Sequence, residues 1–122
     1  MYNQGALAYQ KTAQQTADPR TLEATLLSRS AAHLQAIRDT WPERQNELEV
    51  ELTKNRKIWS IFIQSVTRED SPLPRQLREN IANLGIFIMG QTYEMLLTRD
   101  PAKLDALIDI NRQISAGLRG KG

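Results

Sequence analysis

The chain has 122 residues, of which 40% are hydrophobic and 25% charged, and its formal net charge is +2. This length and composition are typical of one soluble globular domain that buries a core of its own. The absence of cysteine excludes disulfides and thiolate metal sites. Acidic and basic residues are spread evenly, so the basic surface expected of a nucleic-acid-binding protein is weak.

No targeting segment or membrane-spanning segment is expected. The first residues lack the basic and apolar stretches of a signal peptide. The longest apolar run is far shorter than the ~20 residues that span a bilayer. These features favour a cytoplasmic protein that does not associate with a membrane.

Five prolines divide the chain, and none falls inside an apolar helical period. Proline fits the first turn of a helix and is excluded from its interior. Asp18 and Asp100 each precede a proline and can cap a helix start, and a third start is expected near Pro42. The helices expected from these patterns, in chain order, cover residues 2–16, 19–39, 42–67, 73–98 and 101–116.

The first expected helix offers little apolar area, because its stripe consists of two tyrosines and two alanines. Residues 1–17 are therefore predicted to form a loosely docked N-terminal helix. Two interpretations stay open: simple peripheral packing, or a movable arm that binds or covers a site. The stripe residues are Tyr2, Ala6, Tyr9 and Ala13.

The second expected helix carries His33, the only histidine of the chain. A lone histidine without further ligands or a nearby nucleophile is most often structural. The sequence also lacks a Cys–His pair, an H-E-x-x-H motif, a phosphate-binding glycine loop and a nucleophile elbow. We therefore expect no catalytic residues, no metal and no cofactor, and the protein is not predicted to be an enzyme.

The third expected helix has a regular apolar stripe whose members step by four and three residues. This is the seam spacing of helices packed nearly antiparallel. Its first turns are acidic, which suits the helix dipole, and this cluster is interpreted as a solvated face rather than a metal site. The stripe residues are Leu48, Leu52, Asn55, Trp59, Phe62 and Val66, and the acidic residues are Glu43, Glu47, Glu49 and Glu51.

The fourth and fifth expected helices repeat this spacing. Gly85 and Gly90 lie inside the fourth helix, where each costs roughly 1 kcal/mol relative to alanine, so close helix packing is expected there. Gly117 is expected to end the fifth helix, and residues 119–122 are expected to fray. The stripes are Leu77, Ile81, Leu84, Ile88, Gln91 and Met95, followed by Leu104, Leu107, Asn111, Ile114 and Leu118. The predicted fold class is therefore all-α, a small bundle of about five helices in a single domain.

Three stripes contain one amide each: Asn55, Gln91 and Asn111. A buried amide without hydrogen bonds destabilises a fold by roughly 1–3 kcal/mol. Either these amides lie at the seam edge or bond to one another and fix the register of the helices, or one of them meets the backbone of a partner.

Two segments, 58–63 and 84–89, are apolar almost all the way round. A helix that is apolar on every side must be covered on every side. The excess surface is either internal to the bundle or forms a groove for an amphipathic helix of a partner. In the second interpretation the partner-binding residues are Ile58, Ile61, Phe87 and Met89, with Tyr2 and Tyr9 as further contacts.

Four segments of the chain resemble the FlaF family of flagellar biosynthesis regulators. They are M-Y-N-Q-G-A-L-A-Y-Q at residues 1–10, N-R-K-I-W-S-I-F at 55–62, L-P-R-Q-L-R-E-N-I-A-N-L-G-I-F at 73–87, and K-L-D-A-L-I-D-I-N-R-Q-I at 103–114. The resemblance implies a small bacterial cytoplasmic protein needed for flagellin production and export. It also implies a companion regulator, FlbT, that acts on flagellin messenger RNA, and it implies no catalytic residues.

The residues and the resemblance together predict a helical protein that binds flagellin as a secretion chaperone or as a regulator of its export or synthesis. Flagellin has terminal segments that form helices in the filament and need protection beforehand. One alternative is post-transcriptional regulation through FlbT or RNA, and another is a homo-oligomer that pairs its spare apolar faces. The basic residues that would support RNA binding, which are more simply solvated, are Lys54, Arg56, Lys57, Arg75, Arg78, Arg112 and Arg119.

Overall fold

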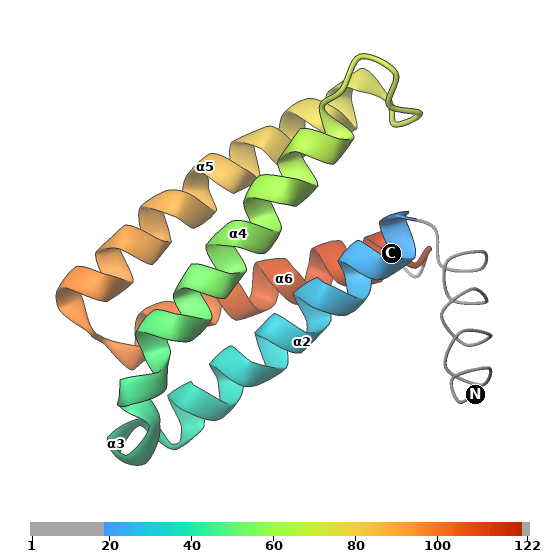
Figure 1. Cartoon of the computed structure of the whole chain (residues 1–122). Helices are drawn as coiled ribbons and strands as arrows, with labels where there is room; N and C mark the ends of the chain where they lie inside the picture. The colour runs from blue at the N-terminus through green and yellow to red at the C-terminus, as the bar shows by residue number, and fades with distance from the viewer. Residues whose placement is uncertain (1–18, 121–122) are drawn as a thin grey trace, which may run out of the picture.

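In the computed structural model the described residues, 19–120, fold into four long helices joined by short turns (Figure 1). These helices are α2 (Pro19–Asp39), α4 (Leu48–Val66), α5 (Arg75–Thr98) and α6 (Leu104–Leu118). The all-α prediction is confirmed for this part of the chain. The expected first helix, with Tyr2 and Tyr9, lies outside the described residues.

Helix α2 packs antiparallel to both α6 and α4. In the α2–α6 pair, hydrogen bonds at both ends of the helices fix their alignment. The Ser115 hydroxyl donates to the carbonyl of Ala24 (2.8 Å) at one end of the α2–α6 pair. At the other end Arg38 donates to Asp105 (2.7 Å). This hydrogen bond, with a second one to Asp39, raises the pKa of Arg38, so the guanidinium stays charged.

The turn from α2 to α4 departs from the single helix expected over residues 42–67. The chain forms a one-turn helix, α3 (Trp41–Arg44), and then a 3-10 turn, η1 (Gln45–Glu47), before α4 begins. No residue of α3 or η1 is buried, whereas Leu48 is fully buried. Trp41 is the only apolar side chain of this turn that packs against the core, and the residues from Glu43 to Glu47 are all polar, so the prediction of one continuous helix was wrong at its N-terminal part.

Helix α5 begins at Arg75 and not at residue 73. Pro74 follows Leu73, and a residue before proline is biased away from the helical conformation. Pro74 itself has an extended ψ of 148°. The predicted start of the fourth helix was therefore two residues early.

The predicted cap at Asp100 is confirmed, because its carboxylate accepts a hydrogen bond from the backbone N–H of Ala102 (3.1 Å). It caps a 3-10 turn, η2 (Pro101–Lys103), which leads into α6. The predicted stop at Gly117 was wrong, since α6 continues to Leu118. The left-handed residue that follows the helix is Gly120 (φ 76°), a conformation that favours glycine.

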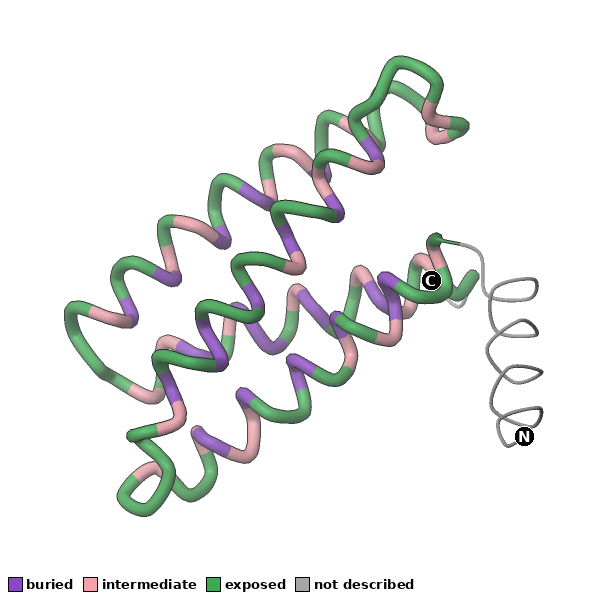
Figure 2. The backbone as a smooth tube through the Cα atoms, in the orientation of Figure 1, coloured by how far each residue is buried: buried purple, intermediate pink, exposed green. Residues whose placement is uncertain are grey.

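The core lies between the four helices, and each presents one buried side to it (Figure 2). The stripe predicted for α4 is confirmed in full, because all six of its residues are completely buried. In α6 the predicted Leu104, Leu107 and Asn111 are buried, with Ile108 and Ser115 added, whereas the predicted Ile114 and Leu118 are half-buried. In α5 the predicted Ile81, Ile88 and Met95 are buried, whereas Gly85 and Thr92 complete the buried row in place of Leu77, Leu84 and Gln91.

Two of the three seam amides bond to each other, as one of the interpretations predicted. The Asn111 side-chain N–H donates to Asn55 Oδ1 (2.7 Å), and the indole N–H of Trp59 donates to Asn111 Oδ1 (2.9 Å). The Ser30 hydroxyl lies 2.9 Å from Glu51 Oε2 and 3.1 Å from Asn55 Oδ1, so it extends the network to α2. Gln91 is half-buried at the edge of its seam.

Candidate partner-binding surface

The side of α5 that points away from the core carries a second row of apolar residues. Ile86 is 71% exposed, and Tyr93 and Leu97 are each 67% exposed. With Gly90 they step by four, three and four residues, which is the spacing of a helix–helix seam. We call this surface the α5 outer face; it consists of Ile86, Phe87, Gly90, Tyr93 and Leu97.

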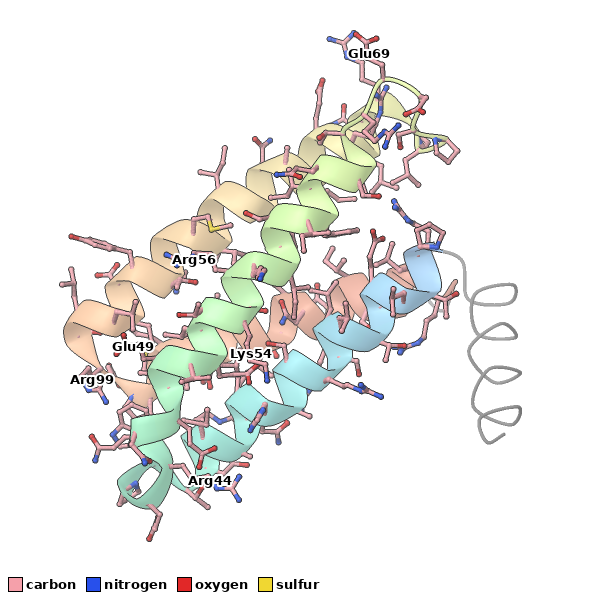
Figure 3. All side chains as sticks on the ribbon, in the orientation of Figure 1. Arg44, Glu49, Lys54, Arg56, Glu69 and Arg99 are labelled. Atoms are coloured by element: carbon pink, nitrogen blue, oxygen red, sulfur yellow. The ribbon has the colours of Figure 1, made fainter. Side chains whose placement is uncertain are left out.

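The α5 outer face is almost without charge. Between residues 80 and 98 the only charged side chain is Glu94, whose carboxylate lies 3.6 Å from the ammonium of Lys103. Figure 3 shows, by contrast, Glu49, Lys54 and Arg56 along α4. Contiguous apolar surface that lacks charge and carries tyrosine and phenylalanine is characteristic of interaction sites.

The two glycines inside α5 have different surroundings. A Cβ atom built at Gly85 would overlap Ile63 Cδ1, so the absence of a side chain there lets α4 and α5 pack closely with Ile63 in its present position. A Cβ atom at Gly90 would meet nothing within 4 Å. The close packing expected at both glycines is thus confirmed for Gly85, while the folded protein gives no reason for glycine at position 90.

The structure distributes the predicted partner-binding residues over several surfaces. Ile58 is half-buried in a hollow between α2 and α4, and Ile61 is exposed in a different, shallow hollow beside Ser65. Met89 is half-buried and packs against the core. Phe87 is 46% exposed and belongs to the α5 outer face. The remaining two, Tyr2 and Tyr9, lie outside the described residues.

Sequence reasoning missed Gly90, Tyr93 and Leu97 as members of this surface. Their signal was present, because positions 86, 90, 93 and 97 have the same spacing as the core stripes. The periodicity of α5 could not show which of its two apolar rows faces α4. Only the tertiary arrangement makes that distinction.

An apolar groove of about 220 Å³ opens between the first turns of α5 and the last turns of α6. Arg20 of α2 lies at its side, paired with Glu23 (2.9 Å), and its Nη1 has no hydrogen-bond partner among the described residues. The groove has room for only one or two side chains and is therefore a smaller site than the α5 outer face. Its apolar lining consists of Leu73, Leu77, Ile81, Ile114, Gly117 and Leu118.

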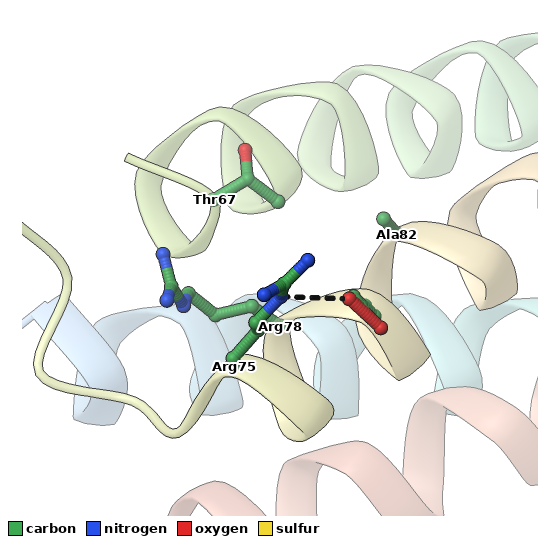
Figure 4. A pocket seen from close by; sticks show the side chains of 5 residues that line it. Thr67, Arg75, Arg78 and Ala82 are labelled. Atoms are coloured by element: carbon green, nitrogen blue, oxygen red, sulfur yellow. Dashed lines mark hydrogen bonds and ion pairs between the residues drawn. The ribbon is translucent and has the colours of Figure 1, made fainter. Parts of the chain in front are cut away.

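A more polar hollow of about 240 Å³ lies between the end of α4 and the start of α5 (Figure 4). Two of its lining residues are arginines; Arg75 is paired with a carboxylate, whereas the buried Nε of Arg78 has no hydrogen-bond partner among the described residues. Arg75 pairs with Glu79 (3.2 Å), the contact that the dashed line marks, and Arg78 donates to the backbone carbonyl of Arg68 (3.3 Å). This hollow is a weak candidate for binding a phosphate.

The described residues contain no group of three or more His, Asp or Glu side chains placed to hold a metal ion. His33 instead joins α2 to α4, with its Nδ1 2.8 Å from Glu51 and its Nε2 3.7 Å from Glu47. Among these same residues no helix combines the length and the hydropathy required to cross a bilayer. Four of the nine large exposed hydrophobic residues in the described part of the chain lie on the α5 outer face, which makes it our candidate for binding a partner.

Comparison with known proteins gives one match. The family model described as flagellar protein FlaF matches residues 6–118, a range that contains every helix from α2 to α6. No curated protein and no solved structure matches the chain.

Proposed function

The chain belongs to the FlaF family of flagellar proteins, and on that premise we propose that it binds flagellin through the α5 outer face, as a chaperone or a regulator of flagellin export. Membership in the family assigns the protein to flagellum biogenesis. The observation that carries the proposal is the exposed, nearly uncharged row of Ile86, Tyr93 and Leu97.

The dimensions of the α5 outer face suit a helix as the ligand. Its row covers the twelve residues 86–97, whose eleven steps of 1.5 Å give a length of about 16 Å. An amphipathic helix docks on such a surface with apolar anchors spaced at i, i+3 or i+4, and i+7. The terminal segments of flagellin, which are helical in the filament, would bury these anchors against α5 until export.

The expected affinity is moderate. Complete burial of an apolar side chain contributes roughly 1.5–3 kcal/mol, and the three most exposed residues of the row would each gain most of that amount. Part of this gain is offset by the loss of translational and rotational freedom, so these residues alone support a dissociation constant weaker than about 1 µM. Binding of this strength is reversible, as a protein that must release its cargo requires.

The first test replaces an exposed apolar residue of the face with a charged one. Leu97→Glu and Tyr93→Glu should each weaken binding of flagellin monomer about tenfold or more, because docking would bury an unpaired carboxylate. Helical content and Tm should stay unchanged, since both side chains are exposed in the folded protein. Isothermal titration calorimetry with purified flagellin measures the affinity, and circular dichroism checks the fold.

Val50→Glu is the matched control, because Val50 is 65% exposed on α4 and lies outside the α5 outer face. It should bind flagellin like the wild-type protein. Equal loss of binding in the Val50 variant, or normal binding by the Leu97 and Tyr93 variants, would exclude this face as the flagellin site.

The same titration separates apolar docking from RNA binding. Apolar docking survives a several-fold increase in salt, whereas RNA binding weakens steeply as counterions compete for the phosphates. If the isolated protein bound no flagellin at either salt concentration, regulation through FlbT or RNA would become the better account.

A further inference from the structure

The apolar groove beside α6 lies where α5 and α6 diverge, since the two helices contact each other only sparsely (Figure 1). Each wall of the groove is a short apolar row. Leu73, Leu77 and Ile81 step by four residues on one side, and Ile114 and Leu118 do the same on the other. Leu77 is 41% exposed. The described residues therefore leave part of this apolar surface uncovered.

The chain that precedes α2 begins beside the groove. Residues 1–18, which lie outside the described residues, join α2 at Pro19, and Arg20 already lines the groove. Position 9 is eleven residues before Arg20, and a chain can span up to ~3.3–3.6 Å per residue, so this position can reach any part of the groove. A short tether gives its segment an effective concentration of about 1 mM at a neighbouring site. A free partner must therefore bind much more tightly to displace it.

The sequence of residues 1–18 matches the groove in spacing and in size. Tyr2, Ala6, Tyr9 and Ala13 step by four, three and four residues, which suits packing along two apolar rows. The alanines on either side of Tyr9 leave it as one bulky side chain between small ones. The groove has a volume of about 220 Å³, which is room for one or two side chains.

Arg20 adds a polar requirement at the side of the groove. Its Nη1 is buried and has no hydrogen-bond partner among the described residues, a condition that destabilises a fold. A tyrosine hydroxyl can accept a hydrogen bond while its ring is buried in apolar surroundings. A tyrosine in this groove would therefore satisfy both the apolar walls and the guanidinium.

We propose that residues 1–18 cover this groove in the folded protein, with Tyr9 as the side chain that enters it. Of the two interpretations that the sequence left open for this segment, the groove supports an arm that covers a site. Only two side chains of the segment, Lys11 and Asp18, are charged, so the stripe can be buried without burying a charge. The proposal does not depend on flagellin binding, because the groove and the α5 outer face are different surfaces.

Disulfide cross-linking in the full-length protein tests this contact, because the natural chain has no cysteine. The reporter pair is Ala6→Cys with Gly117→Cys. Gly117 lines the groove, and a Cβ atom there would meet nothing within 4 Å, so a cysteine fits without strain. Under mild oxidation this pair should form an intramolecular disulfide, and adding Tyr9→Ala should slow its formation about tenfold. Mass spectrometry of the unreduced protein measures the rate, and circular dichroism checks the fold of each variant.

Ala6→Cys with Leu22→Cys is the matched control. Leu22 is 55% exposed and lies close to the same tether on α2, but it does not line the groove. An arm that does not dock would reach position 22 at least as readily as position 117, so the reporter pair should react about tenfold or more faster than the control only if the arm occupies the groove.

Three results would overturn the proposal. Equal rates for the two pairs would leave the groove to another protein. Disulfide-linked dimers in place of the intramolecular product would identify a second copy as the occupant. A rate that Tyr9→Ala leaves unchanged would show that Tyr9 does not enter the groove.

Discussion

The side chain of Asn111 is the centre of the buried hydrogen-bond network. Its amide oxygen accepts from the Trp59 indole, and its amide nitrogen donates to Asn55 and lies 3.4 Å from the carbonyl of Leu27. These contacts join α6 to α4 and α2 with every group out of contact with water. A shift of α6 by a single residue would break them all, so the network selects one register among the many that an apolar seam alone would allow.

Asn111→Ala should lower the free energy of unfolding by about 3 kcal/mol. The substitution leaves the Trp59 N–H without a buried acceptor and opens a small cavity beside it. Urea unfolding followed by circular dichroism measures the change. Asn83→Ala, at an exposed position of α5, is the control and should change stability by no more than about 0.5 kcal/mol. A loss at Asn111 as small as that of the control would show that the network contributes little.

At the scale of the elements, α4 and α5 show what a sequence can and cannot determine. Helix α4 has charged residues on its outward side, so its apolar stripe defines one face, and all six predicted residues are buried. Helix α5 is apolar on nearly every side, so its periodicity is compatible with more than one buried row. Its seam is centred on Gly85 and Thr92, two small residues that hydrophobicity does not single out.

The same limit applies to the candidate site. The sequence predicted spare apolar surface on α4 and α5, and Phe87 is part of the α5 outer face. Whether a given apolar residue is spare depends on which neighbour covers it, and that is set by tertiary packing. Ile58 is half-buried because it lies in the hollow between α2 and α4, and Met89 is half-buried because it packs against the core; no local pattern encodes either relation.

The two glycines of α5 should respond to the same substitution with opposite signs. Gly85→Ala should lower the free energy of unfolding by about 1–2 kcal/mol, since the new methyl group overlaps Ile63. Gly90→Ala should raise it by up to about 1 kcal/mol, since the position is open. Chemical denaturation of both variants under identical conditions measures the difference.

The overlap at Gly85 can be tested directly by removing the atom responsible. Ile63→Val deletes Cδ1 and alone should cost about 0.5–1.5 kcal/mol. In combination with Gly85→Ala it should be less harmful than the two single effects added together, because one methyl group replaces the other. Additive losses would mean that Ile63 does not determine the requirement for glycine.

At the scale of the whole molecule, the four helices differ in how extensively they pack against the others. Helix α2 packs along both α6 and α4, whereas α5 packs mainly along α4 and touches α6 sparsely (Figure 1). The turn after α5 contacts the segment of α3 and η1 through Arg99. Its guanidinium donates to the carbonyl of Gln45 (3.1 Å), and its Cζ lies 5.8 Å from the centroid of the Trp41 ring. At its other end α5 borders the apolar groove beside α6. Helix α5 is thus anchored at one end and along one side.

This unequal anchoring predicts the order in which the helices open. Backbone amides of α5 should exchange with solvent about tenfold or more faster than those of α2, α4 and α6, because fewer buried contacts must break. Hydrogen–deuterium exchange read by NMR measures this, with α6 as the internal standard. Flagellin bound to the α5 outer face should slow exchange in α5 more than elsewhere, since the partner would cover the side that the fold leaves bare. If α5 exchanged in step with α4 in the free protein, the two helices would open as one unit, and α5 would not be the weakly held element described here.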